Sequence, residues 1–95
     1  MNTLGATIDE LTDIIARRSG VDPDKSYTAK LFQGDLDCLL KKIGEEATEV
    51  VMAGKDLDSN QLRYEAVDLI YHLLVACERL GVSTEDLATE IRGRF

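Results

Sequence analysis

Apolar residues recur along this chain at three- and four-residue steps, which is the period of an α-helix and not of a β-strand. The clearest run marks one helical face between residues 36 and 51: Leu36, Leu39, Leu40, Ile43, Ala47, Val50 and Val51. A second run, from residue 58 to residue 80, is apolar in almost every direction around the helix axis. A helix with that composition is normally buried on several sides.

Cap and breaker residues divide the pattern into helices joined by short connections. We expect a first helix after a capping box with Thr7 at the cap and Glu10 three residues later, ending near Gly20. Residues 26–33 fit a short helix and a turn equally well. The remaining expected boundaries are Gly34 as a stop, Asp35 and Asp58 as caps of the two long helices, Gly81 as a stop, and Ser83 as the cap of a last helix.

The chain is therefore predicted to be a single all-α domain over residues 1–95, built as a small bundle of four to five helices with a Leu/Ile/Val/Ala core. A chain of 95 residues has difficulty covering a helix that is apolar all round. We therefore expect a homo-oligomer, with a dimer as the simplest form, in which the subunits complete each other's core.

Charge and cysteine content narrow the function classes. The net charge of −7 argues against nucleic-acid binding and against anionic membrane surfaces, since both require a basic face. No apolar stretch is long enough to span a membrane, and the N-terminal residues do not resemble a secretion signal, so a cytoplasmic protein is expected. Cys38 and Cys77 are far apart and form no metal-ligand spacing, which is typical of free thiols.

Two pairs of carboxylates with the same three-residue spacing are the candidate chemistry. Glu46 and Glu49 follow the edge of the apolar face of the first long helix, with Lys42 one turn before them. Glu65 and Asp68 lie on a narrow polar strip of the other long helix. Carboxylates on a buried helix face carry a penalty of several kcal/mol each when they have no partner. A divalent cation held between the two pairs would remove that penalty, and oxygen ligands favour Mg²⁺ or Mn²⁺ over Zn²⁺.

Simpler interpretations remain open from the residues alone. A single Glu-x-x-Glu pair is usually a solvated helix face, and a lone histidine such as His72 is more often a core residue with satisfied hydrogen bonds than a ligand. A di-iron site is disfavoured because that class uses two Glu-x-x-His motifs. Gly44 is unfavourable in the middle of a helix, and close approach of a neighbouring helix would explain it.

The acidic motif, residues 45–49 (EEATE), fifteen further residues and then residues 65–68 (EAVD), resembles the signature of the all-α, MazG-like nucleoside-triphosphate pyrophosphohydrolases. Within that superfamily the chain is more similar to the phosphoribosyl-ATP pyrophosphohydrolases. Three phrases carry that closer resemblance, which extends over essentially the whole chain: residues 26–31 (SYTAKL), 42–49 (KIGEEATE) and 68–74 (DLIYHLL).

The resemblance implies a Mg²⁺-dependent enzyme of histidine biosynthesis that converts 1-(5-phosphoribosyl)-ATP to 1-(5-phosphoribosyl)-AMP and pyrophosphate. It implies that Glu46, Glu49, Glu65 and Asp68 are metal ligands, and that Glu46 or Glu49 also activates the attacking water. The substrate-binding residues that it implies, or that adjoin the implied segment, are Ser26, Tyr27, Thr28, Lys30, Lys42 and His72.

Two competing hypotheses remain. A house-cleaning pyrophosphohydrolase acting on nucleotides such as dUTP or dCTP would share the acidic motif, but residues 26–28 argue against it. A non-catalytic helical dimerisation module would place the four carboxylates in solvent, pointing away from one another. It would leave the acidic strip on the second long helix unexplained.

Overall fold

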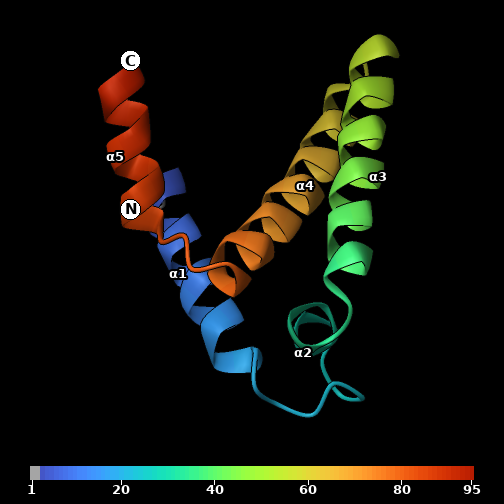
Figure 1. Cartoon of the computed structure of the whole chain (residues 1–95). Helices are drawn as coiled ribbons and strands as arrows, with labels where there is room; N and C mark the ends of the chain where they lie inside the picture. Colours follow the sequence, from blue (N-terminus) through green and yellow to red (C-terminus); the bar gives the residue numbers. More distant parts are fainter. Residues whose placement is uncertain (1–2) are drawn as a thin grey trace.

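The computed structural model describes residues 3–95, and within that range the chain contains five α-helices and no β-strand (Figure 1). The predicted all-α class is confirmed. In the described range, no helix is both long enough and apolar enough to cross a bilayer. The helices are α1 (Leu4–Arg18), α2 (Tyr27–Gln33), α3 (Leu36–Lys55), α4 (Ser59–Arg79) and α5 (Thr84–Arg94).

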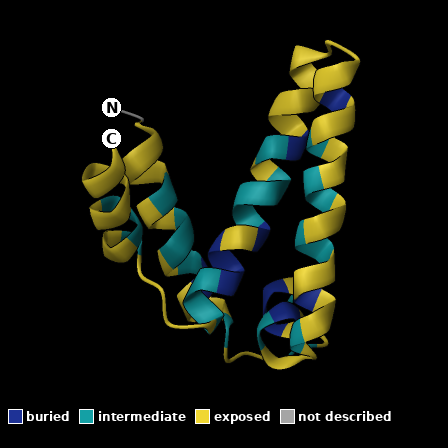
Figure 2. Cartoon of the chain, turned by 45° about the horizontal axis from the view of Figure 1, so that its top comes forward, coloured by how far each residue is buried: buried dark blue, intermediate teal, exposed yellow. Residues whose placement is uncertain are grey.

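Helices α3 and α4 form a long antiparallel hairpin, which is the most extensive helix–helix contact of the chain (Figure 1). Helix α1 packs against α4 near the base of the hairpin, and the short α2 lies at that base, in contact with α1, α3 and α4. Helix α5 lies beside α1, and residues of both helices line one cavity (Figures 1 and 2). The outer half of the hairpin extends away from the other helices.

Most of the predicted helix caps are confirmed. The side chains of Asp35 and Asp58 accept hydrogen bonds from the first-turn amides of α3 and α4. Ser83 and Asp86 form a complete capping box at α5. Residues 26–33, which fitted a turn and a helix equally well, form helix α2, with Ser26 as its cap.

The start of the first helix differs from the prediction. Thr3, and not Thr7, is the N-cap of α1, because its side-chain oxygen accepts a hydrogen bond of 3.1 Å from the amide of Ala6. Thr7 lies inside the helix and donates its hydroxyl to the Thr3 carbonyl at 2.8 Å. A second hydroxyl residue four positions earlier lets the helix form one more turn, so the later capping signal is not used.

The buried core lies where α1, α2, the start of α3 and the second half of α4 meet, as Figure 2 shows by its dark positions. Ile15, Leu39 and Val75 are its fully buried large side chains. Large apolar residues on the outer half of the hairpin are instead exposed, among them Val51 and Val67. The base of the hairpin is therefore held by the chain's own core, whereas its outer half is not.

Candidate functional site

Three carboxylates from the two long helices converge in the hairpin. Glu46 of α3 and Glu65 and Asp68 of α4 each offer an oxygen, and these oxygens all lie within 4.8 Å of one another. Glu65 is buried, with 7% of its surface exposed, whereas Glu46 and Asp68 are half-buried. Gln61, one turn before Glu65, donates a hydrogen bond of 2.7 Å to the Glu65 carboxylate. This convergence excludes the diverging arrangement that a purely structural helical module would have.

The electrostatics of this acidic cluster favour a bound cation. Burial raises the pKa of the Glu46 carboxyl above its ordinary value of 4.5, and the nearby charges of Asp68 and Glu65 raise it further against the opposing effects of His72 and Lys42. The ion pair found among the described residues joins Arg94 to Glu90, far from the cluster in sequence. It involves none of these three carboxylates. A crowded set of hard oxygen donors, one of them buried, fits Mg²⁺ or Mn²⁺.

Glu49, the fourth predicted ligand, does not join the cluster. It is exposed, while Glu46 is half-buried. Three residues of helix rotate a side chain by about 300°, so Glu49 is turned about 60° from Glu46 toward the edge of the hairpin. Lys42, one turn before Glu46, is half-buried on the same flank of α3. Its charge acts on the Glu46 carboxyl without forming an ion pair with it.

His72 connects the acidic cluster to helix α2. Its imidazole is buried, and its Nδ1 lies 2.7 Å from the backbone carbonyl oxygen of Asp68. A carbonyl can only accept, so Nδ1 carries a proton and donates to it, while Nε2 lies within hydrogen-bond distance, 3.0 Å, of the hydroxyl of Tyr27. Burial raises the pKa of Tyr27, with the charges of Tyr71 and Glu46 as further causes, so its hydroxyl keeps its proton. The pair thus joins α2 to the backbone of a cluster residue.

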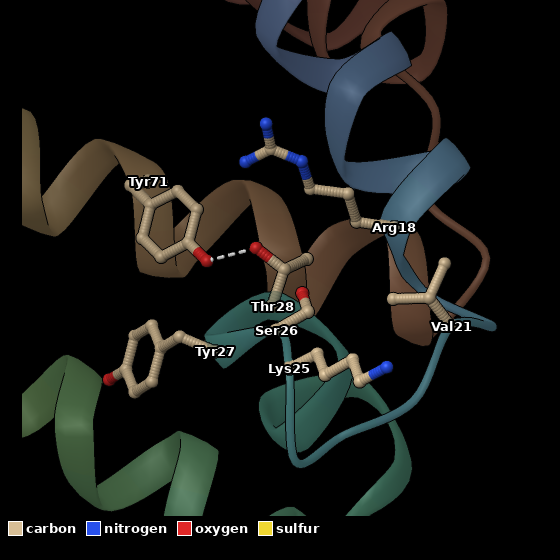
Figure 3. A pocket seen from close by; sticks show the side chains of 7 residues that line it. All are labelled: Arg18, Val21, Lys25, Ser26, Tyr27, Thr28 and Tyr71. Carbon is tan, nitrogen blue, oxygen red and sulfur yellow. Dashed lines mark hydrogen bonds between the residues drawn. The ribbon is translucent and has the colours of Figure 1, made fainter.

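A cavity of about 650 Å³ adjoins this pair, between the end of α1, the start of α2 and the side of α4 (Figure 3). Tyr27 lines it from α2 and Tyr71 from α4. The hydroxyls of Thr28 and Tyr71 hydrogen-bond to each other across its floor at 2.5 Å. The remaining lining residues are Arg18, Val21, Lys25 and Ser26.

The predicted substrate-binding residues are only partly brought together. Ser26, Tyr27 and Thr28 line the cavity, and His72 lies behind Tyr27, whereas Lys30 is exposed and does not line it. Lys30 lies one turn further along α2 than Ser26 and Tyr27, beyond the residues that line the cavity. Sequence reasoning missed Arg18 and Tyr71 as cavity residues. The motif in residues 68–74 contains Tyr71, but nothing in the sequence connects Arg18 to residue 26 or 28.

Comparison with known proteins decides the family. The family model of phosphoribosyl-ATP pyrophosphohydrolase matches residues 8–95 of the chain. The chain belongs to this family. The resemblance seen in the sequence motifs is thereby confirmed, and the acidic cluster described above lies within the matched region.

Curated relatives agree with the family assignment. The phosphoribosyl-ATP pyrophosphatase of Trichlorobacter lovleyi is 44% identical over 95 residues, which cover 100% of this chain and 88% of that protein. The phosphoribosyl-ATP pyrophosphatase of Dechloromonas aromatica is 46% identical over 87 residues, or 92% of this chain and 81% of its own. The histidine biosynthesis bifunctional protein HisIE of Thermus thermophilus is 44% identical over 85 residues, which cover 90% of this chain and 40% of that longer protein.

Proposed function

We propose that this protein hydrolyses 1-(5-phosphoribosyl)-ATP to 1-(5-phosphoribosyl)-AMP and pyrophosphate, the second step of histidine biosynthesis. The observation that supports this most directly is the convergence of Glu46, Glu65 and Asp68 within a member of the phosphoribosyl-ATP pyrophosphohydrolase family. A triphosphate is itself strongly anionic, and the chain carries a net charge of −7. The substrate therefore needs a site where local positive charge outweighs the overall field of the protein.

Magnesium, with manganese as a substitute, is the cation we assign to the cluster. Glu46, Glu65 and Asp68 would hold it, and Glu49 would add a fourth carboxylate at the exposed edge. When bound, such an ion neutralises charge that develops on the phosphate oxygens of a phosphoanhydride. The buried position of Glu65 and its hydrogen bond from Gln61 keep one ligand in a fixed orientation.

The remaining roles follow from the position of each side chain. Glu46 or Glu49 accepts a proton from the attacking water. Lys42 contacts the phosphates as a point charge from the same flank of α3. His72 and Tyr27 hydrogen-bond to each other and hold the start of α2 beside the cluster.

The decisive experiment is a substrate panel measured with and without Mg²⁺. Pyrophosphate release should be rapid with phosphoribosyl-ATP and slow with dUTP and dCTP, and chelation of the metal should abolish it. Efficient release from the deoxynucleotides and none from phosphoribosyl-ATP would instead favour a house-cleaning enzyme. No release from any substrate, together with no thermal stabilisation by Mg²⁺, would favour a helical module without activity.

Variants of the carboxylates test the assigned roles. We expect Asp68→Asn and Glu49→Gln to lower turnover by a factor on the order of 10² or more, since each would remove a metal ligand or a general base. The matched control is Glu45→Gln, because Glu45 is exposed on α3 and does not belong to the cluster. Circular dichroism should show unchanged helix content in all three. Near-normal turnover of Asp68→Asn at saturating Mg²⁺ would refute the assignment.

We also propose that the chain works as a homodimer. A typical monomer of 10.5 kDa exposes about 5,400 Å², whereas this chain exposes 6870 Å². Helices α3 and α4 each carry an apolar line at i, i+4, i+7 and i+11 spacing, and in an antiparallel pair these two lines turn to the same side. We call this surface the apolar hairpin face; its residues are Leu40, Gly44, Ala47 and Val51 of α3 and Leu62, Ala66, Leu69 and Leu73 of α4.

A further inference from the structure

The cavity at the base of the hairpin is lined by two cations to which the proposed hydrolytic step gives no role. Arg18, at the end of α1, and Lys25, before α2, both line it, and no acidic residue is among its lining residues in the described chain. Neither cation forms an ion pair with any residue that the structure describes. Two cations without an ion-pair partner around one cavity are notable in a chain with a net charge of −7.

The arrangement of these groups suits a phosphate monoester. The Arg18 guanidinium points over the cavity toward the hydroxyls of Thr28 and Tyr71, as Figure 3 shows. The Ser26 hydroxyl accepts the Ala29 amide at 3.1 Å, and its own proton is free to be donated. A planar guanidinium with hydroxyl donors beside it is the combination that proteins use for phosphate oxygens.

Local contacts fix the backbone around both cations. Lys25 closes a turn, because its amide donates to the carbonyl of Asp22 at 3.0 Å, with Pro23 at the second position of that turn. The Gln33 side chain donates to the backbone carbonyls of Ser19 and Val21, at 2.8 Å each, and so holds the connection between α1 and α2 against α2. The cavity is therefore shaped by hydrogen-bonded backbone.

Tyr27 separates this cavity from the acidic cluster. Its ring lines the cavity, while its hydroxyl points away from Lys25 and bonds to His72, whose other nitrogen bonds to the Asp68 carbonyl. A cationic site and an anionic, metal-binding site thus lie on opposite sides of one aromatic side chain. A ligand with phosphate groups at two separate ends would match both sites.

The substrate of the proposed reaction has that form, since 1-(5-phosphoribosyl)-ATP carries a triphosphate on one ribose and a single phosphate on the other. We propose that Arg18 and Lys25 bind this remote phosphate, which selects the substrate over nucleoside triphosphates that lack it. This inference rests on the proposed function. It assigns the cavity to recognition, and the acidic cluster to the triphosphate and the chemistry.

Kinetics of charge-removing variants test the assignment. Arg18→Gln and Lys25→Gln should each raise KM for phosphoribosyl-ATP by a factor on the order of ten while leaving kcat nearly unchanged, because the remote phosphate is bound equally in the ground and transition states. The double variant should show a larger effect, and Arg18→Lys should restore part of it. The matched controls are Arg17→Gln and Lys55→Gln, exposed residues that do not line the cavity.

A binding measurement without metal or turnover gives an independent test. By calorimetry, wild-type protein should bind phosphoribosyl-AMP more tightly than AMP, and Arg18→Gln should lose that difference. Equal binding of the two nucleotides by the wild type, or a KM that the single and double variants leave unchanged, would overturn the cavity assignment alone. A wild-type protein that releases no pyrophosphate from phosphoribosyl-ATP would instead refute the proposed function.

Discussion

The carboxylates at and beside the acidic cluster differ in burial and in hydrogen bonding. Glu65 is buried and hydrogen-bonded, Asp68 contributes its carboxylate to the cluster and its backbone carbonyl to His72, and Glu46 has a raised pKa. Glu49 lies outside this cluster and is exposed. That position suits the base role proposed for Glu49, at the edge of the site where the substrate approaches.

The pH dependence of the free energy of unfolding should report the unfavourable environment of the charged Glu46 carboxylate. Its pKa in the fold lies above the ordinary 4.5, so the folded state favours the protonated form. The contribution of protonated Glu46 to the free energy of unfolding is therefore complete below pH 4.5. It is lost as the pH rises through the pKa of Glu46 in the folded state. In metal-free buffer, Glu46→Gln should become more stable than the wild type as the pH increases from 4.5 toward 7, measured by urea denaturation.

The control for this measurement is Glu45→Gln, which alters an exposed carboxylate on the same helix outside the cluster. It should leave the pH dependence of the wild type unchanged. Mg²⁺ should stabilise the wild type, so that near neutral pH the wild type has a higher free energy of unfolding than Glu46→Gln. Parallel pH profiles for wild type and Glu46→Gln would show that Glu46 is not under electrostatic strain.

Among the elements, the short helix α2 does the most to position the site. It has only seven residues, so its stability depends on contacts with the rest of the chain. The Arg79 side chain at the end of α4 donates to the Leu31 carbonyl at 2.8 Å, and Thr28 hydrogen-bonds to Tyr71. These contacts place Tyr27 between the cavity and His72.

Gly34 ends α2 where only a glycine fits without rearrangement. A Cβ at this position would lie 2.7 Å from the Lys30 carbonyl oxygen, which is a backbone atom that cannot move without distorting α2. We expect Gly34→Ala to lower the free energy of unfolding by about 1 to 2 kcal/mol, in the range of other incompatible backbone substitutions. It should also raise KM, because α2 carries the cavity residues.

Gly54→Ala is the matched control, since a Cβ at Gly54, near the end of α3, would meet no atom within 4 Å. Its stability should be unchanged or higher by up to about 1 kcal/mol, through the better helix propensity of alanine. Urea denaturation of both variants measures the difference. Equal stabilities of Gly34→Ala and wild type would mean that the end of α2 can shift freely.

At the scale of the whole molecule, the hairpin is longer than the core that supports it. The radius of gyration of the chain, 14.2 Å, exceeds the roughly 12 Å expected for a compact chain of this length. A Cβ at Gly44 would meet nothing within 4 Å, so the neighbouring helix of the same chain does not explain this glycine. Gly44 lies in the apolar hairpin face, where close packing against a second copy would account for it.

Disruption of the apolar hairpin face should separate the proposed dimer. Val51 is 63% exposed on this face, and Val51→Glu would place a charge in the interface. By analytical ultracentrifugation we expect a dimer for the wild type and a monomer for Val51→Glu. Met52→Glu is the control, because Met52 is similarly exposed but shares its line on α3 with the exposed polar residues Lys41, Glu45 and Thr48. A monomeric wild type would contradict the proposal.

Local sequence signals were sufficient for most of the helices, because caps such as Asp35, Asp58 and Ser83 act through amides only two or three residues away. They failed at Thr7, where two hydroxyl residues one turn apart compete for the same role. Helical spacing also places Glu46 and Glu49 on one flank of α3, and Glu65 and Asp68 on one strip of α4.

The tertiary structure decided which residues meet across large separations in the chain. Helical period places Glu49 on the flank of α3, but only the packing of α4 determines that Glu46 joins the cluster and that Glu49 stays exposed. The cavity formed by Arg18, Lys25 and Tyr71 depends on how α1 and α2 pack against α4. Periodicity and caps describe only neighbours along the chain, so they contain no information about that packing.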